Sequence, residues 1–194
     1  MARRCDRAGV RRHALTEIAA GLVAWVGASL VVLSDGRRGL ALGMAMATAG
    51  LAAIVWADVG PVPAVLVAIG GAAAAGRRLT SGPAGWNVMP GGSTPRFILC
   101  VAAGLLAAWV AFGVTGGHGP GLRFAAISVV GLSVARVLFT TAPETVLSGV
   151  SVLALAVATI SEFEQGGAEP WPFLAAALIA AGASWIPIRA ADAA

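Results

Sequence analysis

A short stretch of the chain gathers most of the side chains that could do chemistry. Arg136 lies inside an apolar run, Glu144 precedes the next run, and Ser148 and Ser151 lie three residues apart on one face of that run. Ionisable groups inside long apolar segments are costly and usually functional. Arg136 could bind an anionic group, pair with Glu144, or extend its long side chain to the end of its segment. We therefore take these four residues as a candidate substrate or packing site.

Catalytic and metal-binding patterns are missing around these residues. His13 and His118 have no HExxH partner, and Cys5 and Cys100 are too far apart in the sequence to resemble a metal motif. A serine nucleophile would need His118 as its base, and we expect the two on opposite sides of the fold. The glycine-rich stretch 77–96 has no lysine, so it is not a phosphate-binding loop. The sequence predicts no enzymatic activity, no cofactor and no metal.

The basic residues gather between the apolar runs. All 13 are arginine, and the formal net charge is +4. Arginines at the ends of apolar segments favour contact with anionic lipid headgroups. No stacking aromatics accompany the arginine pairs, which argues against a nucleic-acid partner. The predicted headgroup contacts are Arg37, Arg38, Arg77, Arg78 and Arg96.

The elements that must position these residues are long and apolar. Of the 194 residues, 58% are hydrophobic and 11% charged, against about 25% charged in an ordinary soluble domain. We therefore expect a multi-pass protein of the cell (plasma or inner) membrane. The abundance of Ala, Gly and Arg without Lys further suggests a bacterium with a GC-rich genome.

Seven apolar runs are long enough to be considered as membrane-crossing helices, since about 20 helical residues span a hydrocarbon core of ~30 Å. The third is the shortest, and whether it crosses or re-enters is left open. The first is expected to be a retained helix and not a cleaved signal peptide. The sequence predicts an all-α transmembrane helix bundle with six to seven spans. The runs are 15–33, 39–57, 62–76, 97–115, 122–140, 145–161 and 171–188.

The connections divide the chain into five parts. Residues 141–144 have the pattern of a capping box that starts a helix directly after the previous one ends. The longest connection separates two three-helix halves. The predicted parts are an Arg-rich tail (1–13), a first half (14–76), a connecting loop (77–96), a second half (97–161), and an acidic loop with the last helix (162–194).

Short matches between the two halves raise the question of an internal duplication. The segment 19–25 resembles 102–109, so that Trp25 and Trp109 correspond, and later matches keep nearly the same offset. A duplication predicts a 3+3 inverted repeat followed by one C-terminal helix. Matches that arise by chance in a chain rich in Ala, Gly and Leu are the alternative.

Counting flanking arginines does not settle the orientation. Seven spans divide the arginines equally between the two sides, whereas a re-entrant third segment places most of them on the side of the N-terminus. The six-span arrangement predicts that a reporter fused after Ala194 lies in the cytoplasm.

The sequence is compatible with three functions. The first is a non-enzymatic accessory or structural subunit, or an assembly partner, that packs against other membrane proteins or itself. Its support is the close-packing patterns at residues 39–43, 45–49 and 113–117. The alternative is a small inverted-repeat transporter or permease for an uncharged or lipid-like substrate, bound where the starts of the third and sixth helices meet. The weakest is a membrane enzyme that uses Arg77, Arg78, His118 and Glu164 on a lipid headgroup.

Overall fold

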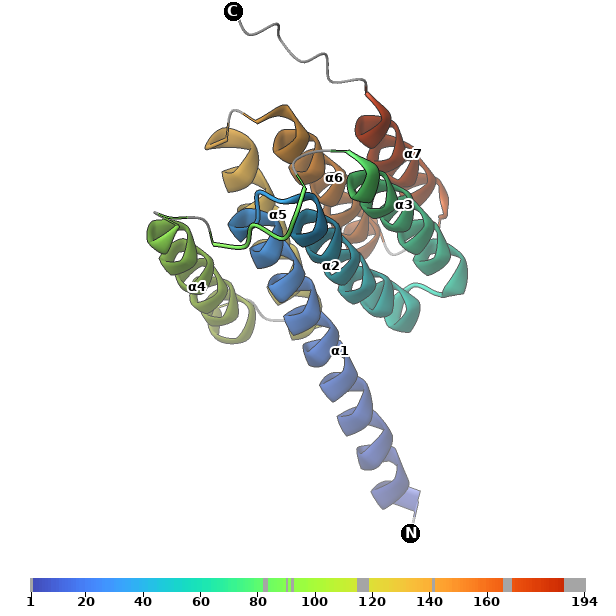
Figure 1. The fold of residues 1–194 in the computed structure, drawn as a ribbon. Coiled ribbons are helices and arrows are strands. Elements are labelled where there is room, and N and C mark those ends of the chain that lie inside the picture. Colours follow the sequence, from blue (N-terminus) through green and yellow to red (C-terminus); the bar gives the residue numbers. More distant parts are fainter. Residues whose placement is uncertain are drawn as a thin grey trace, which may run out of the picture.

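The described residues form seven α-helices in the computed structural model (Figure 1), which confirms the predicted all-α helix bundle. The structure describes residues 2–81, 84–89, 91, 93–114, 119–140, 142–165 and 169–186, without the side chains of 2–12 and 162–165. The capping box at 141–144 includes Thr141, which lies outside the described residues. The helices are α1 (Ala2–Leu33), α2 (Arg37–Asp58), α3 (Pro61–Thr80), α4 (Thr94–Trp109), α5 (Pro120–Leu138), α6 (Pro143–Gln165) and α7 (Trp171–Trp185), with a π-helical turn, η1 (Val110–Val114), after α4.

Six of the helices are long and apolar enough to cross a membrane. They include α3, which the sequence marked as the weakest segment. Its helix continues through Arg77 and Arg78 to Thr80 and reaches 20 residues, because arginine is a good helix former. A re-entrant third segment is therefore not observed. The shortest helix is α7, with 15 residues.

Six helices form a closed ring, and the seventh lies outside it. Contacts run in the order α1–α2–α3–α7–α6–α5 and back to α1, and α2 also touches α6 across the middle. Helix α4 packs only against α5 and α1 among the described helices, and Figure 1 shows it standing apart from the ring. The ring is thus the core of the fold, and α4 is its most loosely attached element.

Glycines bring α1 and α2 into close contact. A Cβ atom at Gly27 would lie 2.1 Å from the backbone nitrogen of Ala47, and one at Gly50 would lie 2.5 Å from the carbonyl oxygen of Ala20. Any larger side chain at these positions would push the helices apart. Gly43 lies in the same contact, against Val31. The small-residue pattern at 39–43 is therefore used inside the chain, whereas Ala45 of the pattern 45–49 is exposed.

Successive helices run in opposite directions, so the bundle has two ends. The Asp35 end carries the α1–α2 turn, the end of α3, the start of α4, the α5–α6 turn and the end of α7. The opposite, Glu17 end carries the starts of α3, α5 and α7; there the Glu17 side chain accepts a hydrogen bond from the Leu122 amide at 3.1 Å. This bond caps α5, whose N-cap is Gly119 and has no side chain. The N-terminus and the end of α7 lie at opposite ends (Figure 1), as a seven-span arrangement requires.

The predicted duplication is matched by helix direction but not by contacts. Helices α4–α6 run opposite to α1–α3, as an inverted repeat requires. However, α1 contacts α5, while α4, its counterpart, has no contact with α2 among the described residues. Trp25 is half-buried and donates to the carbonyl of Cys100 at 3.3 Å, whereas Trp109 is 64% exposed. The duplication stays a prediction.

Candidate functional site

The α1–α2 turn at the Asp35 end is held by a returning loop. The backbone amide of Asp35 donates to the carbonyl of Asn87 at 3.2 Å, and the amide of Met89 donates to Leu33 at 3.1 Å. Gly36 lies directly against this loop, where a Cβ atom would come within 2.6 Å of the Gly85 carbonyl. These backbone contacts fix the position of Asp35 independently of the interactions of its side chain.

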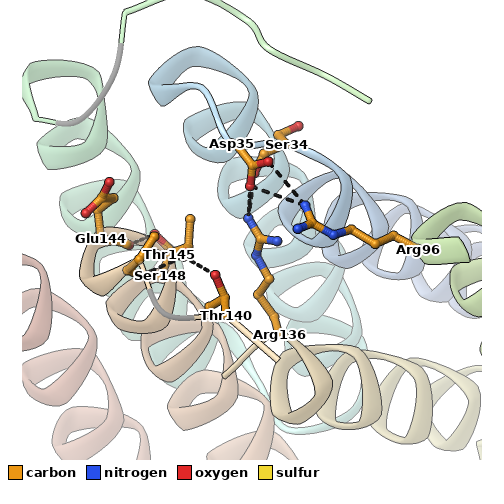
Figure 2. Close-up of polar contacts among 9 residues, drawn as sticks. Ser34, Asp35, Arg96, Arg136, Thr140, Glu144, Thr145 and Ser148 are labelled. Atoms are coloured by element: carbon orange, nitrogen blue, oxygen red, sulfur yellow. Dashed lines mark hydrogen bonds and ion pairs between the residues drawn. The ribbon is translucent and has the colours of Figure 1, made fainter. Parts of the chain in front are cut away.

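The carboxylate of Asp35 joins two arginines from different helices (Figure 2). Arg136, at the end of α5, donates through Nη2 to Asp35 and to the backbone carbonyl of Ser34, the latter at 3.0 Å. Arg96, in the first turn of α4, donates through Nη1 at 3.2 Å. The Arg136 side chain is 3% exposed and that of Arg96 is 42% exposed. This Asp35 cluster therefore ties α5 and α4 to the α1–α2 turn.

Arg136 thus pairs with a residue that sequence reasoning did not select. Of its predicted interactions, a pairing with Glu144 is not observed, and the Glu144 side chain points away from Arg136 in Figure 2. Asp35 lies 101 positions away in the sequence. One signal was available, since Asp35 is a lone carboxylate in a tight turn expected at the same end of the bundle as Arg136.

The two serines of the predicted site are fully buried and bonded to backbone carbonyls. Ser148 donates to Glu144 at 2.8 Å, and Ser151 donates to Leu147 at 2.8 Å and to Ala180 of α7 at 3.1 Å. The bond from Ser151 to Ala180 joins two helices, and such bonds support helix packing in a membrane. The structure therefore places Ser151 in the α6–α7 contact, and among the described residues neither serine is hydrogen-bonded to Arg136.

The structure does not form the transport site that was predicted where the starts of the third and sixth helices meet. The start of α3 lies at the Glu17 end and the start of α6 at the Asp35 end, so these starts do not meet. It is the end of α3 that approaches Glu144, whose charge acts on Arg78. Because the chain reverses direction between successive helices, an odd-numbered and an even-numbered helix start at opposite ends of the bundle.

Arg77 and Arg78 have contrasting surroundings at the end of α3. Arg77 lies over the ring of Trp185, with 5.7 Å from its guanidinium carbon to the ring centre, and donates to the Thr80 hydroxyl at 3.1 Å. Arg78 is 1% exposed. Its Nε and Nη2 atoms are buried and have no hydrogen-bond partner among the described residues. Arg78, one of the five predicted headgroup contacts, is therefore inside the protein.

A cavity of about 240 Å³ opens between α4 and α5 beside the Asp35 cluster. Arg96 and Arg136 line it at the end of the bundle, and the rest of its wall is apolar. Arg96, one of the predicted headgroup contacts, thus lines this cavity. Arg37 and Arg38 begin α2 at the same end of the bundle and do not line it. The apolar lining residues are Val32, Pro95, Leu99, Ala135 and Phe139.

A second cavity, of about 220 Å³, lies on the other side of α4, against α1. Its wall is almost entirely apolar and includes Leu22, Trp25, Leu105 and Phe124. Between the two cavities, α4 is attached by buried small residues, with Gly104 set against the Trp25 ring. Helix α4 therefore has an open space on each side.

Two residues of the enzyme alternative cannot be placed. His118 and the side chain of Glu164 lie outside the described part of the chain. Within that part, no group of three or more His, Cys, Asp or Glu residues could hold a metal ion.

Comparison of the chain with protein-family models, curated proteins and solved structures gives no significant match. The fold and its six membrane-length helices define the class: this is a multi-pass integral membrane protein with an all-α bundle. What it does there has to be argued from its own site.

Proposed function

We propose that the protein is a non-catalytic, lipid-binding accessory protein of the membrane. It holds an anionic lipid in the cavity between α4 and α5, with the headgroup at Arg96. The observation that carries this proposal is the combination of an apolar cavity of about 240 Å³ with two guanidinium groups at its end.

The charge of the Asp35 cluster favours an anionic headgroup. Two arginines share one carboxylate, so the cluster has a net charge of +1. Among the described residues, Arg96 uses only Nη1 in these bonds, and its side chain is 42% exposed. Its other N–H groups can therefore donate to phosphate oxygens, which guanidinium binds well.

The position of the cavity suits a lipid that enters from the side. Arg96 lies in the first turn of α4, where a membrane-crossing helix reaches the headgroup region. Leu99 and Phe139, which face the cavity, are 44% and 80% exposed and offer apolar contact to an acyl chain. The lipid would thus extend its chain along the α4–α5 groove.

An accessory role is supported by the attachment of α4. The described part of α4 presents bulky apolar side chains over most of its circumference and few contacts to the ring. A bound lipid that fills the groove would fix the angle of α4 and prepare its outer face for a membrane partner. The hydroxyls of Ser148 and Ser151, in contrast, are bonded to backbone carbonyls of α6 and, for Ser151, of α7, and offer little to a transported substrate.

The test is lipid retention after purification in a mild detergent, measured by native mass spectrometry. We expect about one anionic phospholipid per chain. Arg96→Gln should weaken its retention about fivefold, since one arginine near anionic headgroups contributes about 1 kcal/mol. Arg77→Gln is the matched control, because it removes the same charge at the same end of the bundle but away from the cavity.

Two results would contradict the proposal: no enrichment of anionic lipid, or equal loss in both variants. The same preparation tests the accessory role. A protein that co-purifies in stoichiometric amount and dissociates from Arg96→Gln supports it, and the absence of any such protein opposes it.

A further inference from the structure

The guanidinium of Arg78 is a buried cation without a bonded partner. Its residue is 1% exposed, and both Nε and Nη2 are buried without a hydrogen bond among the described residues. Glu144 is the carboxylate whose charge acts on it, but the two form no ion pair. Burying a charge without compensation is expensive, so such a group calls for a missing partner.

The two unpartnered nitrogens are the pair that binds oxyanions. Nε and Nη2 point their N–H groups to the same side of the planar guanidinium. This fork donates two parallel hydrogen bonds to the oxygens of one phosphate or carboxylate. A single water molecule could not use both donors with the same geometry or neutralise the charge.

We propose that Arg78 is the centre of an oxyanion-binding site, in which the Nε/Nη2 fork holds a phosphate group at the end of α3. The phosphate comes either from a lipid headgroup or from free inorganic phosphate. Helix α3 ends two residues later at Thr80, which is exposed, so the site is close to water. The Nε and Nη2 atoms are buried, so this end of the bundle must open locally before the ion can bind.

The site is independent of the α4–α5 cavity. Helix α3 contacts α2, α7 and α6, and has no contact with α4 or α5 among the described residues. Arg96→Gln should consequently leave oxyanion binding unchanged. Failure of the lipid proposal and failure of this one are thus separate results.

The test is thermal unfolding of the delipidated protein in detergent, with inorganic phosphate titrated at constant ionic strength. We expect a saturable rise in the midpoint that chloride does not produce. Arg78→Lys keeps the charge but loses the fork, and should weaken the apparent phosphate affinity at least tenfold. Arg77→Lys, next in the chain and half-exposed, is the matched control and should leave it unchanged. Glu144→Gln should strengthen it severalfold by removing a negative charge.

A second arm identifies the source of the phosphate. Nanodiscs of phosphatidylcholine alone and nanodiscs containing phosphatidic acid are compared without free phosphate. Stabilisation by phosphatidic acid that depends on Arg78 indicates a headgroup, whereas a response to inorganic phosphate alone indicates the free ion. The proposal is overturned if neither source stabilises the protein, or if Arg78→Lys responds as the unmodified chain does. It is also overturned if Arg78 and Glu144 prove strongly coupled in a double-mutant cycle without any response to phosphate.

Discussion

The α1–α2 contact and the surroundings of α4 are packed in opposite ways. In the first, a Cβ atom at Gly27 would lie 2.1 Å from the neighbouring backbone. Around α4, cavities of about 240 and 220 Å³ remain. Only 22% of the most apolar stretch of Thr94–Val114 is buried, against 56% of the corresponding stretch of α2. Lipid chains are as apolar as leucine, so close backbone approach is what holds membrane helices together. The glycine-rich side is therefore the closely packed one, and the side of α4 leaves open space.

The largest effect is expected at the close contact. Gly27→Leu should destabilise the bundle by about 3 kcal/mol or more, because the added side chain overlaps the backbone of α2. Unfolding in mixed detergent micelles measures this loss. Ala19→Leu, at an exposed position of α1, is the control and should change stability little. Equal losses would contradict the proposed division between a tight and a loose side.

The next largest effect is expected where the two regions are joined. Asp35→Ala should cost about 2 kcal/mol, because it leaves Arg136 buried without a carboxylate. Breaking a fully buried ion pair costs about 3–5 kcal/mol, and the Asp35 side chain is 32% exposed. Adding Arg136→Met in the same chain should restore much of the stability. A double variant no better than Asp35→Ala would show that the pair is not the reason for the loss.

A smaller effect is expected beside α4. Ala108→Leu adds three carbon atoms, against four in Gly27→Leu, and its side chain faces the cavity against α1. It should alter stability by less than about 1 kcal/mol, in either direction, because the side chain has room. The same unfolding assay compares the two substitutions directly. A loss as large as that of Gly27→Leu would mean that the cavity against α1 is closed in the membrane.

The smallest effect is expected for Arg78→Met in phosphate-free detergent. An apolar side chain of similar length replaces a buried charge that has no bonded partner, so stability should stay within about 1 kcal/mol or rise. Lipid retention in the α4–α5 cavity should not change. A loss above about 2 kcal/mol would reveal a partner of Arg78 within the protein.

The sequence predicted the helical class well, because hydropathy and segment length follow from the bilayer thickness. It selected Arg136 as a candidate site residue, but it could not find Asp35 as its partner, since that contact depends on how distant turns meet. It ranked the third segment as the weakest by ending it at Gly76. The arginines that follow are helical, and one of them is buried by contacts between helices. Local composition does not determine such tertiary contacts.

The most direct test of the central claim is where an anionic lipid binds. Phosphatidylglycerol with a photoreactive acyl chain can be crosslinked to the protein in nanodiscs, and the labelled peptides identified by mass spectrometry. The account predicts labelling at the start of α4 and the end of α5, around Leu99 and Phe139, and its loss in Arg96→Gln but not in Arg77→Gln. Labelling spread equally over α2, α3 and α7, or unchanged by Arg96→Gln, would contradict it.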